Sequence, residues 1–146
     1  MTALAHHLAT IDLLCARAFP AQRGRSAAVV SGPGFHIAEL ATSESFWDDE
    51  GTGRREAEEQ YEAECGGLSA LLTGRWGEPQ IFSLRSTLIR SMEGEEMPEP
   101  WHELSGSVPY LEVWRAEGRW IALGVSQQDD ELPFQLLAAV TANDPP

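Results

Sequence analysis

The clearest structural signal in the chain is the stretch YLEVWRAEGRWIALGVS, residues 110–126. Aliphatic and aromatic residues fill two short runs, Tyr110–Arg115 and Arg119–Ser126, on either side of a break that contains Gly118. Two such runs around a glycine are typical of a tight β-hairpin. The sequence therefore predicts a hairpin over these residues.

Two registers are compatible with this hairpin. A two-residue loop pairs Trp114 with Ile121, whereas a three-residue loop closed by a left-handed glycine pairs Trp114 with Trp120. A slip of one residue exchanges the two faces of a strand. We predict the three-residue loop, because it gives the cleaner aliphatic face, made of Leu111, Val113, Ile121 and Leu123.

The opposite face of the predicted hairpin is the candidate binding site. It would carry Tyr110, Glu112, Trp114 and Trp120. Tryptophan and tyrosine are frequent anchors of recognition surfaces. A carboxylate between aromatic rings can hold a cation, or act as a general base where a pocket encloses it. The alternative is that a loop covers this face and the residues serve only the fold.

Two helices are expected before the hairpin. The first has an apolar stripe made of Leu4, Leu8, Ile11, Leu14 and Ala18 and ends before Pro20. The second has a face made of Ala57, Tyr61, Cys65, Leu68 and Leu72, and Gly74 is expected to close it. Gly66 and Gly67 lie inside this second helix, so the pair either breaks it or lets another backbone approach closely. Both stripes are expected to bury against the same sheet.

Four further strands complete the expected fold. Residues 27–31 and 35–41 form a hairpin around Gly32-Pro33-Gly34, and residues 80–92 are β-prone. Residues 134–141 are compatible with a strand or with a short helix opened by Pro133, and we predict the strand. Residues 22–26 and 93–103 are expected to be loops. The sequence thus predicts a single α+β domain over residues 1–146, with an antiparallel sheet of about five to six strands and two helices packed on one face.

The charge of the chain indicates what it binds. The net charge of −13 disfavours nucleic acid and anionic membrane surfaces as partners and favours a basic protein or a cation. A simpler interpretation is that the charge only keeps the domain soluble. The acidic segments 44–64 and 93–103 are expected to lie mostly at the surface, because isolated buried carboxylates are costly.

No metal or cofactor site is predicted. His102-Glu103 lacks the second histidine of a zinc-protease motif, and His6-His7 has poor chelate geometry on a helix. Cys15 and Cys65 are expected to be reduced. The first residues also lack a basic leader and an apolar run, so a cytoplasmic location is expected.

The C-terminal half resembles small acidic actinobacterial proteins of unassigned function. The residues concerned are Trp76-Gly77-Glu78-Pro79, the hairpin from Glu112 to Trp120, and Asp130-Glu131-Leu132-Pro133-Phe134. Some small acidic α+β proteins of such genomes neutralise a cognate toxin, so the resemblance implies an immunity-like or regulatory role.

We therefore expect a non-catalytic acidic binding module for a basic protein partner, present as a monomer or homodimer. The alternative is a small-molecule-binding protein or small enzyme with Glu112 in an aromatic pocket.

Overall fold

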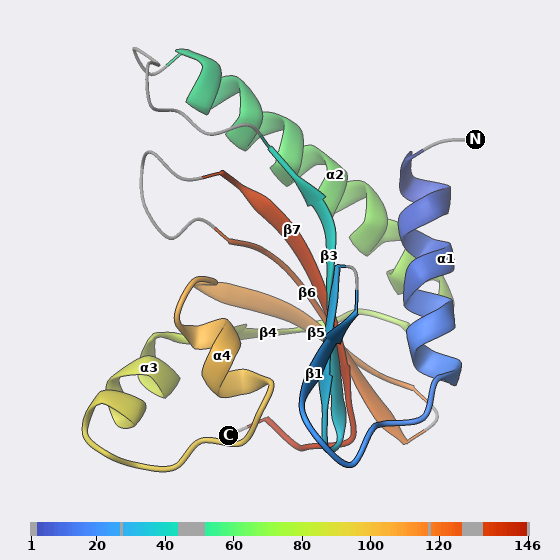
Figure 1. The fold of residues 1–146 in the computed structure, drawn as a ribbon. Coiled ribbons are helices and arrows are strands. Elements are labelled where there is room, and N and C mark those ends of the chain that lie inside the picture. Colours follow the sequence, from blue (N-terminus) through green and yellow to red (C-terminus); the bar gives the residue numbers. More distant parts are fainter. Residues whose placement is uncertain (1–2, 27, 44–51, 117, 127–132, 146) are drawn as a thin grey trace.

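The computed structural model describes residues 3–26, 28–43, 52–116, 118–126 and 133–145. They form a mixed helix and strand fold around one sheet (Figure 1). The helices are α1 (Ala3–Ala16), α2 (Thr52–Trp76), α3 (Arg85–Met92) and α4 (Trp101–Ser105). The strands are β1 (Gly24–Ser26), β2 (Val29–Gly32), β3 (Phe35–Thr42), β4 (Gln80–Ser83), β5 (Tyr110–Ala116), β6 (Arg119–Ser126) and β7 (Gln135–Thr141).

The sheet is antiparallel throughout, in the order β1-β2-β3-β7-β6-β5-β4. It has seven strands, so the expected five to six was too few. The missed strand is β1, which lies within the expected basic loop at 22–26. Its three residues are all exposed, so it carries no hydrophobic alternation that would reveal it. The expected strand at 134–141 is confirmed as β7, which joins the two halves of the chain by pairing with both β3 and β6.

Helices α1 and α2 cover one face of the sheet, as expected (Figure 1). Ile11 and Leu14 of α1 and Leu68 and Leu72 of α2 are fully buried in one cluster with the inner residues of β3, β6 and β7. The stripe of α1 stops earlier than predicted, because the helix ends at Ala16.

The glycine pair does not break α2, which runs unbroken for 25 residues. It allows a close approach, although to a side chain rather than to a backbone. A Cβ atom on Gly67 would lie 3.0 Å from Leu4 Cδ1 of α1, whereas one on Gly66 would meet nothing within 4 Å. The helix also passes through Gly74 and ends at Trp76. Gly77 follows with φ +87°, and its N–H donates to the carbonyl of Thr73.

The other face of the sheet carries a second core, which the sequence analysis missed. Leu84, Trp101, Leu104 and Val108 pack there against the inner residues of β3, β5, β6 and β7. The expected strand over 80–92 was wrong beyond Ser83, because α3 occupies 85–92. The expected loop at 93–103 also includes the start of α4. Two helices on one face was therefore an incomplete description of this fold.

The predicted register of the hairpin was wrong. Trp114 pairs with Ile121 and Arg115 with Trp120, so the two tryptophans lie on opposite faces of the sheet. The choice rested on collecting all the aliphatic residues on one side. Since α1 and α2 cover one face while α4, Leu84 and Val108 cover the other, both faces must be apolar and that criterion fails. Gly118 has φ +80°, a conformation that glycine adopts without strain.

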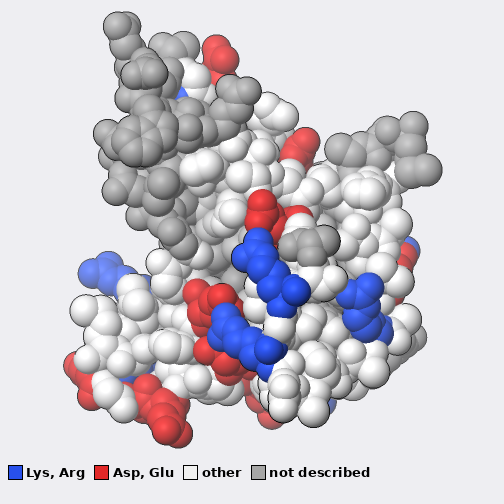
Figure 2. All heavy atoms as spheres, viewed as in Figure 1, with Lys and Arg blue, Asp and Glu red and all other residues white. Residues whose placement is uncertain are grey.

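The acidic segments lie at the surface wherever the structure describes them, which confirms that expectation for residues 52–64 and 93–103. None of their ten described carboxylates is buried, and residues 44–51 lie outside the described part of the chain. On the face shown in Figure 2, arginines and carboxylates lie side by side. Among these contacts Arg23 pairs with Glu103 at 2.8 Å, and Arg25 pairs with Glu39 at 3.7 Å.

Both cysteines are free thiols, as expected. None of the helices in the described ranges is both long and apolar enough to cross a membrane.

Candidate functional site

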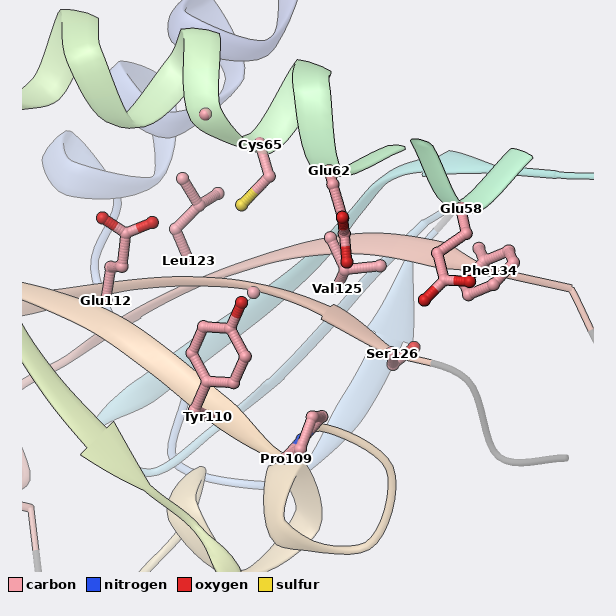
Figure 3. A pocket seen from close by; sticks show the side chains of 12 residues that line it. Glu58, Glu62, Cys65, Pro109, Tyr110, Glu112, Leu123, Val125, Ser126 and Phe134 are labelled. Atoms are coloured by element: carbon pink, nitrogen blue, oxygen red, sulfur yellow. The ribbon is translucent and has the colours of Figure 1, made fainter. Parts of the chain in front are cut away.

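A pocket of about 430 Å³ lies between α2 and the sheet (Figure 3). Its walls come from one side of α2, from β5 and β6, and from Phe134 just before β7. On α2, Glu58, Glu62 and Cys65 are spaced by four and three residues, which places them on one side of the helix. Figure 3 shows their side chains directed toward the sheet, with Tyr110 directed toward the helix. The pocket therefore has an acidic helical wall above a strand floor.

Glu112 is the carboxylate that the sheet contributes to this pocket. It is half-buried, and its Oε2 accepts a hydrogen bond of 2.6 Å from the hydroxyl of Ser69. Ser69 lies one helical turn beyond Cys65 on α2 and is itself buried. This bond holds the carboxylate in place against the helix and leaves Oε1 available to a ligand.

Carboxylates in the pocket lack a counter-cation within the described part of the chain. No ion pair there involves Glu58, Glu62 or Glu112. Other carboxylates do find one, such as Glu103 with Arg23 and Glu95 with Arg90. The pocket is therefore a local concentration of uncompensated negative charge.

The thiol of Cys65 is not a reactive group. Burial, followed by the nearby charges of Glu112 and Glu62, raises its pKa to about 12. The thiol thus stays protonated at neutral pH and is a poor nucleophile and a poor metal ligand. Within the described ranges no group of three or more histidine, cysteine, aspartate or glutamate side chains could hold a metal ion.

The four candidate residues do not form one site. Tyr110 and Glu112 line the pocket together. Trp114 is on the same face of β5 but is buried beneath the end of α2, where its indole N–H donates to the carbonyl of Gly77 at 2.9 Å. Trp120 lies on the other face of the sheet, as the register requires.

Trp120 serves to hold the C-terminal segment. Its indole N–H donates to Asp144 Oδ1 at 3.0 Å, and the Arg115 guanidinium lies 5.1 Å from its ring centroid. These contacts indicate a structural role, so we remove Trp114 and Trp120 from the candidate site.

Sequence reasoning missed the helical half of the pocket. Glu58, Glu62 and Ser69 were treated as part of an acidic surface or left aside. The sequence did contain a signal for them, because their helical spacing places them on one side of α2, beside the apolar face that includes Cys65. Without the position of the sheet, however, the sequence does not tell which border of that face turns toward Glu112.

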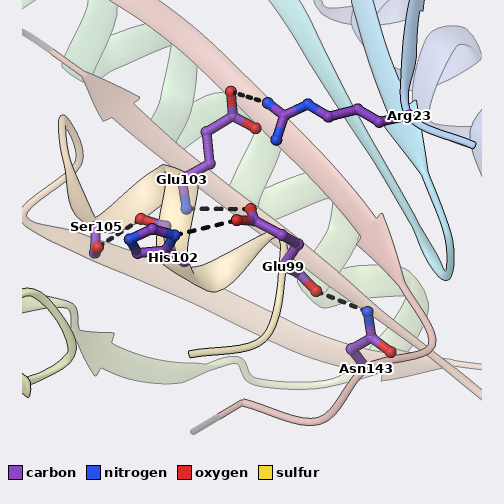
Figure 4. Close-up of polar contacts among 6 residues, drawn as sticks. All are labelled: Arg23, Glu99, His102, Glu103, Ser105 and Asn143. Carbon is purple, nitrogen blue, oxygen red and sulfur yellow. Dashed lines mark hydrogen bonds and ion pairs between the residues drawn. The ribbon is translucent and has the colours of Figure 1, made fainter. Parts of the chain in front are cut away.

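A second polar cluster lies around α4, on the other face of the molecule (Figure 4). His102 Nδ1 lies 3.2 Å from Glu99 Oε1, and Ser105 is close by, so the three residue types of a catalytic triad are present. The Ser105 hydroxyl, however, donates to the backbone carbonyl of His102 at 2.6 Å and not to its ring. Asn143 Nδ2 donates to the carbonyl of Glu99, and the N–H of Glu103 donates to Glu99 Oε2. The cluster therefore fastens α4 to the C-terminal segment and has no triad geometry.

A buried serine–histidine pair lies under the C-terminal end of α1. Ser31 Oγ is 2.5 Å from Nδ1 of His36, which is fully buried against the ring of Phe19. Burial lowers the pKa of His36, and its Nε2 lies 3.4 Å from the carbonyl of Arg17. No carboxylate and no pocket accompanies this pair in the described residues, so it is a contact of the core.

No protein-family model, curated protein or solved structure matches this chain, so its function must be argued from the pocket itself.

Proposed function

We propose that the protein is a non-catalytic binding protein whose pocket holds a positively charged side chain of a basic protein partner. The observation that carries this proposal is the set of three pocket carboxylates, Glu58, Glu62 and Glu112, with no arginine paired to them in the described residues. The net charge of −13 would steer a basic partner toward this surface.

An arginine or lysine side chain suits the lining of the pocket. Carboxylates bind guanidinium groups through charge-assisted hydrogen bonds, and Glu112 is held ready by Ser69. Aromatic side chains at the wall, Tyr110 and Phe134, offer ring surface to a cation or to its aliphatic stem. In chemical terms the partner is a protein that presents an exposed basic side chain. A toxin-neutralising or regulatory role in the cytoplasm, which the actinobacterial resemblance implies, would fit such a partner.

A small organic cation is the second candidate ligand. The volume of about 430 Å³ falls in the range of small-molecule sites, roughly 300–1,000 Å³. A free amine would use the same carboxylates, but it would not need the surface around the pocket. In that case Glu112 would be the one carboxylate placed to act as a base, while the protonated thiol of Cys65 gives no support for nucleophilic catalysis.

A titration of the protein with N-acetyl-arginine amide, followed by nuclear magnetic resonance of the backbone amides, tests the proposal. Residues lining the pocket are expected to shift, and the affinity should fall as salt is raised. Glu62→Gln should weaken binding by about threefold or more, since a charge-assisted bond becomes a neutral one. Glu78→Gln removes one charge from an exposed site outside the pocket and is the matched control.

A steric variant separates binding in the pocket from binding to the general negative field. Gly66 lines the pocket, and a Cβ atom there meets nothing within 4 Å. Gly66→Met should therefore block the pocket, while Gly66→Ala should bind as the native protein does. Equal binding by Gly66→Met and the native protein would place the cation elsewhere and contradict the proposal.

A further inference from the structure

Helix α3 turns its apolar side to solvent. Leu88, Ile89 and Met92 are separated by one, three and four residues, which places them on one side of the helix. Leu88, Ile89 and Met92 are 37%, 46% and 78% exposed, whereas Thr87 is buried against the protein. A helix of a globular protein normally buries such a stripe. The stripe of α3 therefore lacks a partner within the described chain.

Tyr110 at the start of β5 extends this apolar surface. It is 54% exposed and lines one groove together with Leu88 of α3. We call Leu88, Ile89, Met92 and Tyr110 the α3 patch, which holds four of the seven large hydrophobic residues that are exposed in the described chain. An exposed apolar area of this kind is characteristic of an interaction surface.

A groove borders the α3 patch at Leu88 and Tyr110. It has a volume of about 680 Å³ and is lined by α3, by residues 105–109 and by Tyr110. Pro109 and Tyr110 line both this groove and the carboxylate pocket. The two hollows are therefore neighbours that share one wall, and a single bound segment can reach both.

The charges around the patch indicate which partner fits. Residues 80–92 contain Arg85 and Arg90 and no acidic residue. Arg90 pairs with Glu95 at 2.7 Å, so Glu93 and Glu96 are the carboxylates at one border, and the pocket carboxylates lie at the other. At the lower left of Figure 2 a mostly uncharged area has carboxylates along its lower edge and a basic side chain at its upper left. A second copy of this chain carries the same net charge of −13, whereas a basic partner meets opposite charge at the pocket carboxylates and at Glu93 and Glu96.

We propose that the α3 patch docks an amphipathic basic segment of the partner protein, with apolar side chains in the groove and one basic side chain reaching past Tyr110 into the pocket. This inference rests on the proposed function, because the pocket supplies the acidic end of the surface. It adds the apolar anchor, and with it the pattern that the partner's segment must carry.

The test uses a synthetic helical peptide that has a leucine face flanked by arginines. Two companion peptides carry glutamate in place of arginine, or serine in place of leucine. The protein variants are Leu88→Gln and Met92→Gln, which remove apolar contact without changing charge. Leu71→Gln is the matched control, because Leu71 is a similarly exposed leucine on α2, away from the patch.

The arginine–leucine peptide should bind, and its affinity should fall about tenfold in the Leu88→Gln/Met92→Gln double variant but not in Leu71→Gln. Both companion peptides should bind more weakly. Equal binding of the glutamate peptide, no binding of the arginine–leucine peptide, or indifference to the double variant would each overturn the docking surface. Self-association in sedimentation experiments that the double variant abolishes would assign the patch to a second copy instead.

The failure of this inference is distinguishable from that of the proposed function. In one outcome N-acetyl-arginine amide still shifts the amide resonances of the pocket residues, while the peptide binds the Leu88→Gln/Met92→Gln variant as tightly as the native protein. That result would support the pocket and contradict the α3 patch. If neither probe binds, both proposals fall.

Discussion

Gly66, Gly67 and Gly74 in the second half of α2 give a sharp test of how α1 and α2 cross. Each has a negative φ and open helical geometry, so alanine is expected to stabilise the helix by up to about 1 kcal/mol where nothing opposes it. Gly66 and Gly74 meet that condition, because a Cβ atom at either meets nothing within 4 Å. Gly74 lies in the last turns of the helix, so its gain should be the smaller of the two.

Gly67 should behave differently. A Cβ atom there would lie 3.0 Å from Cδ1 of Leu4, which is inside normal contact distance, and 3.5 Å from Cδ2. The leucine must move by a few tenths of an ångström, and we expect this to cancel most of the propensity gain of alanine. Gly67→Leu cannot be relieved in this way and should destabilise the protein by about 1–3 kcal/mol, the usual cost of overpacking. Gly66→Leu projects into the open pocket and should cost far less.

Urea denaturation of the single variants and of Leu4→Ala/Gly67→Ala measures these effects. The double variant relieves the contact, so Gly67→Ala should gain more in the Leu4→Ala background than in the native one, with a coupling of about 0.5 kcal/mol or more. If Gly67→Ala stabilises the protein as much as Gly66→Ala in both backgrounds, α1 does not approach α2 at Gly67 and the packing described here is wrong.

Two further variants test the core and a buried histidine. Leu68→Ala should lower the free energy of unfolding by about 2–5 kcal/mol, because Leu68 is fully buried. Leu71→Ala, on the exposed side of α2, should change it by less than about 0.5 kcal/mol. Equal losses in urea denaturation would show that α2 is wrongly oriented. His7 is buried, neither ring nitrogen meets a hydrogen-bond partner in the described residues, and burial lowers its pKa below 6.5 despite the opposing charge of Glu64. Below pH 6.5 the unfolded state therefore binds a proton at His7 more readily than the folded state does. With respect to His7 the protein is accordingly most stable above pH 6.5, where this residue is neutral, and it loses stability as the pH falls below that value. His7→Leu should therefore raise the free energy of unfolding by about 1–3 kcal/mol, and this difference from the native protein should grow toward acid pH. The control His6→Leu changes an exposed histidine and should show no such growth. A difference for His7→Leu that does not depend on pH would contradict a buried, neutral His7.

The local spacing of apolar residues predicted several helices and strands correctly. The faces of α1 and α2, the strands at 35–42 and 119–126, and the strand at 135–141 all follow from local spacing. The helices bury one side and the strands are mostly apolar runs buried on both faces, and both features are visible in the residue pattern. The same reasoning failed for residues 84–92, where Leu84 and Thr87 face inward while Leu88, Ile89 and Met92 face outward. Hydrophobicity cannot reveal the inner side of a helix whose more apolar side is exposed.

The hairpin shows a second limit. Its existence and length were predictable, but its register depended on whether one or both faces of the sheet are covered. That depends on α4 and the residues beside it, which precede the hairpin and were not recognised as covering the sheet. The error in register then placed Trp120 in the candidate site and made Trp114 its partner. Tyr110 and Glu112 remained because their position on β5 does not depend on the register.

The position of the pocket follows from a mismatch between helix and sheet. The 25 residues of α2 span about 37 Å, whereas the 14 residues of α1 span only about 21 Å. Since Leu4 in the first turn of α1 meets α2 at Gly67, the half of α2 before that point has no neighbouring helix in the described chain. Glu58 and Glu62 lie on that half, over β6, so a hollow there is expected from geometry alone.

What geometry does not explain is the choice of residues around the hollow. Glu58 and Glu62 stand four residues apart on one helix, an arrangement of like charges that costs about 0.2–0.5 kcal/mol relative to a neutral pair. Glu112 brings a third carboxylate to the same space, where glutamine would serve packing equally well. If the charges serve binding, Glu62→Gln should make the protein slightly more stable while weakening the cation site. A chain that holds mutually repelling groups around an open pocket is giving up stability there, and that exchange is the pattern expected of a functional site.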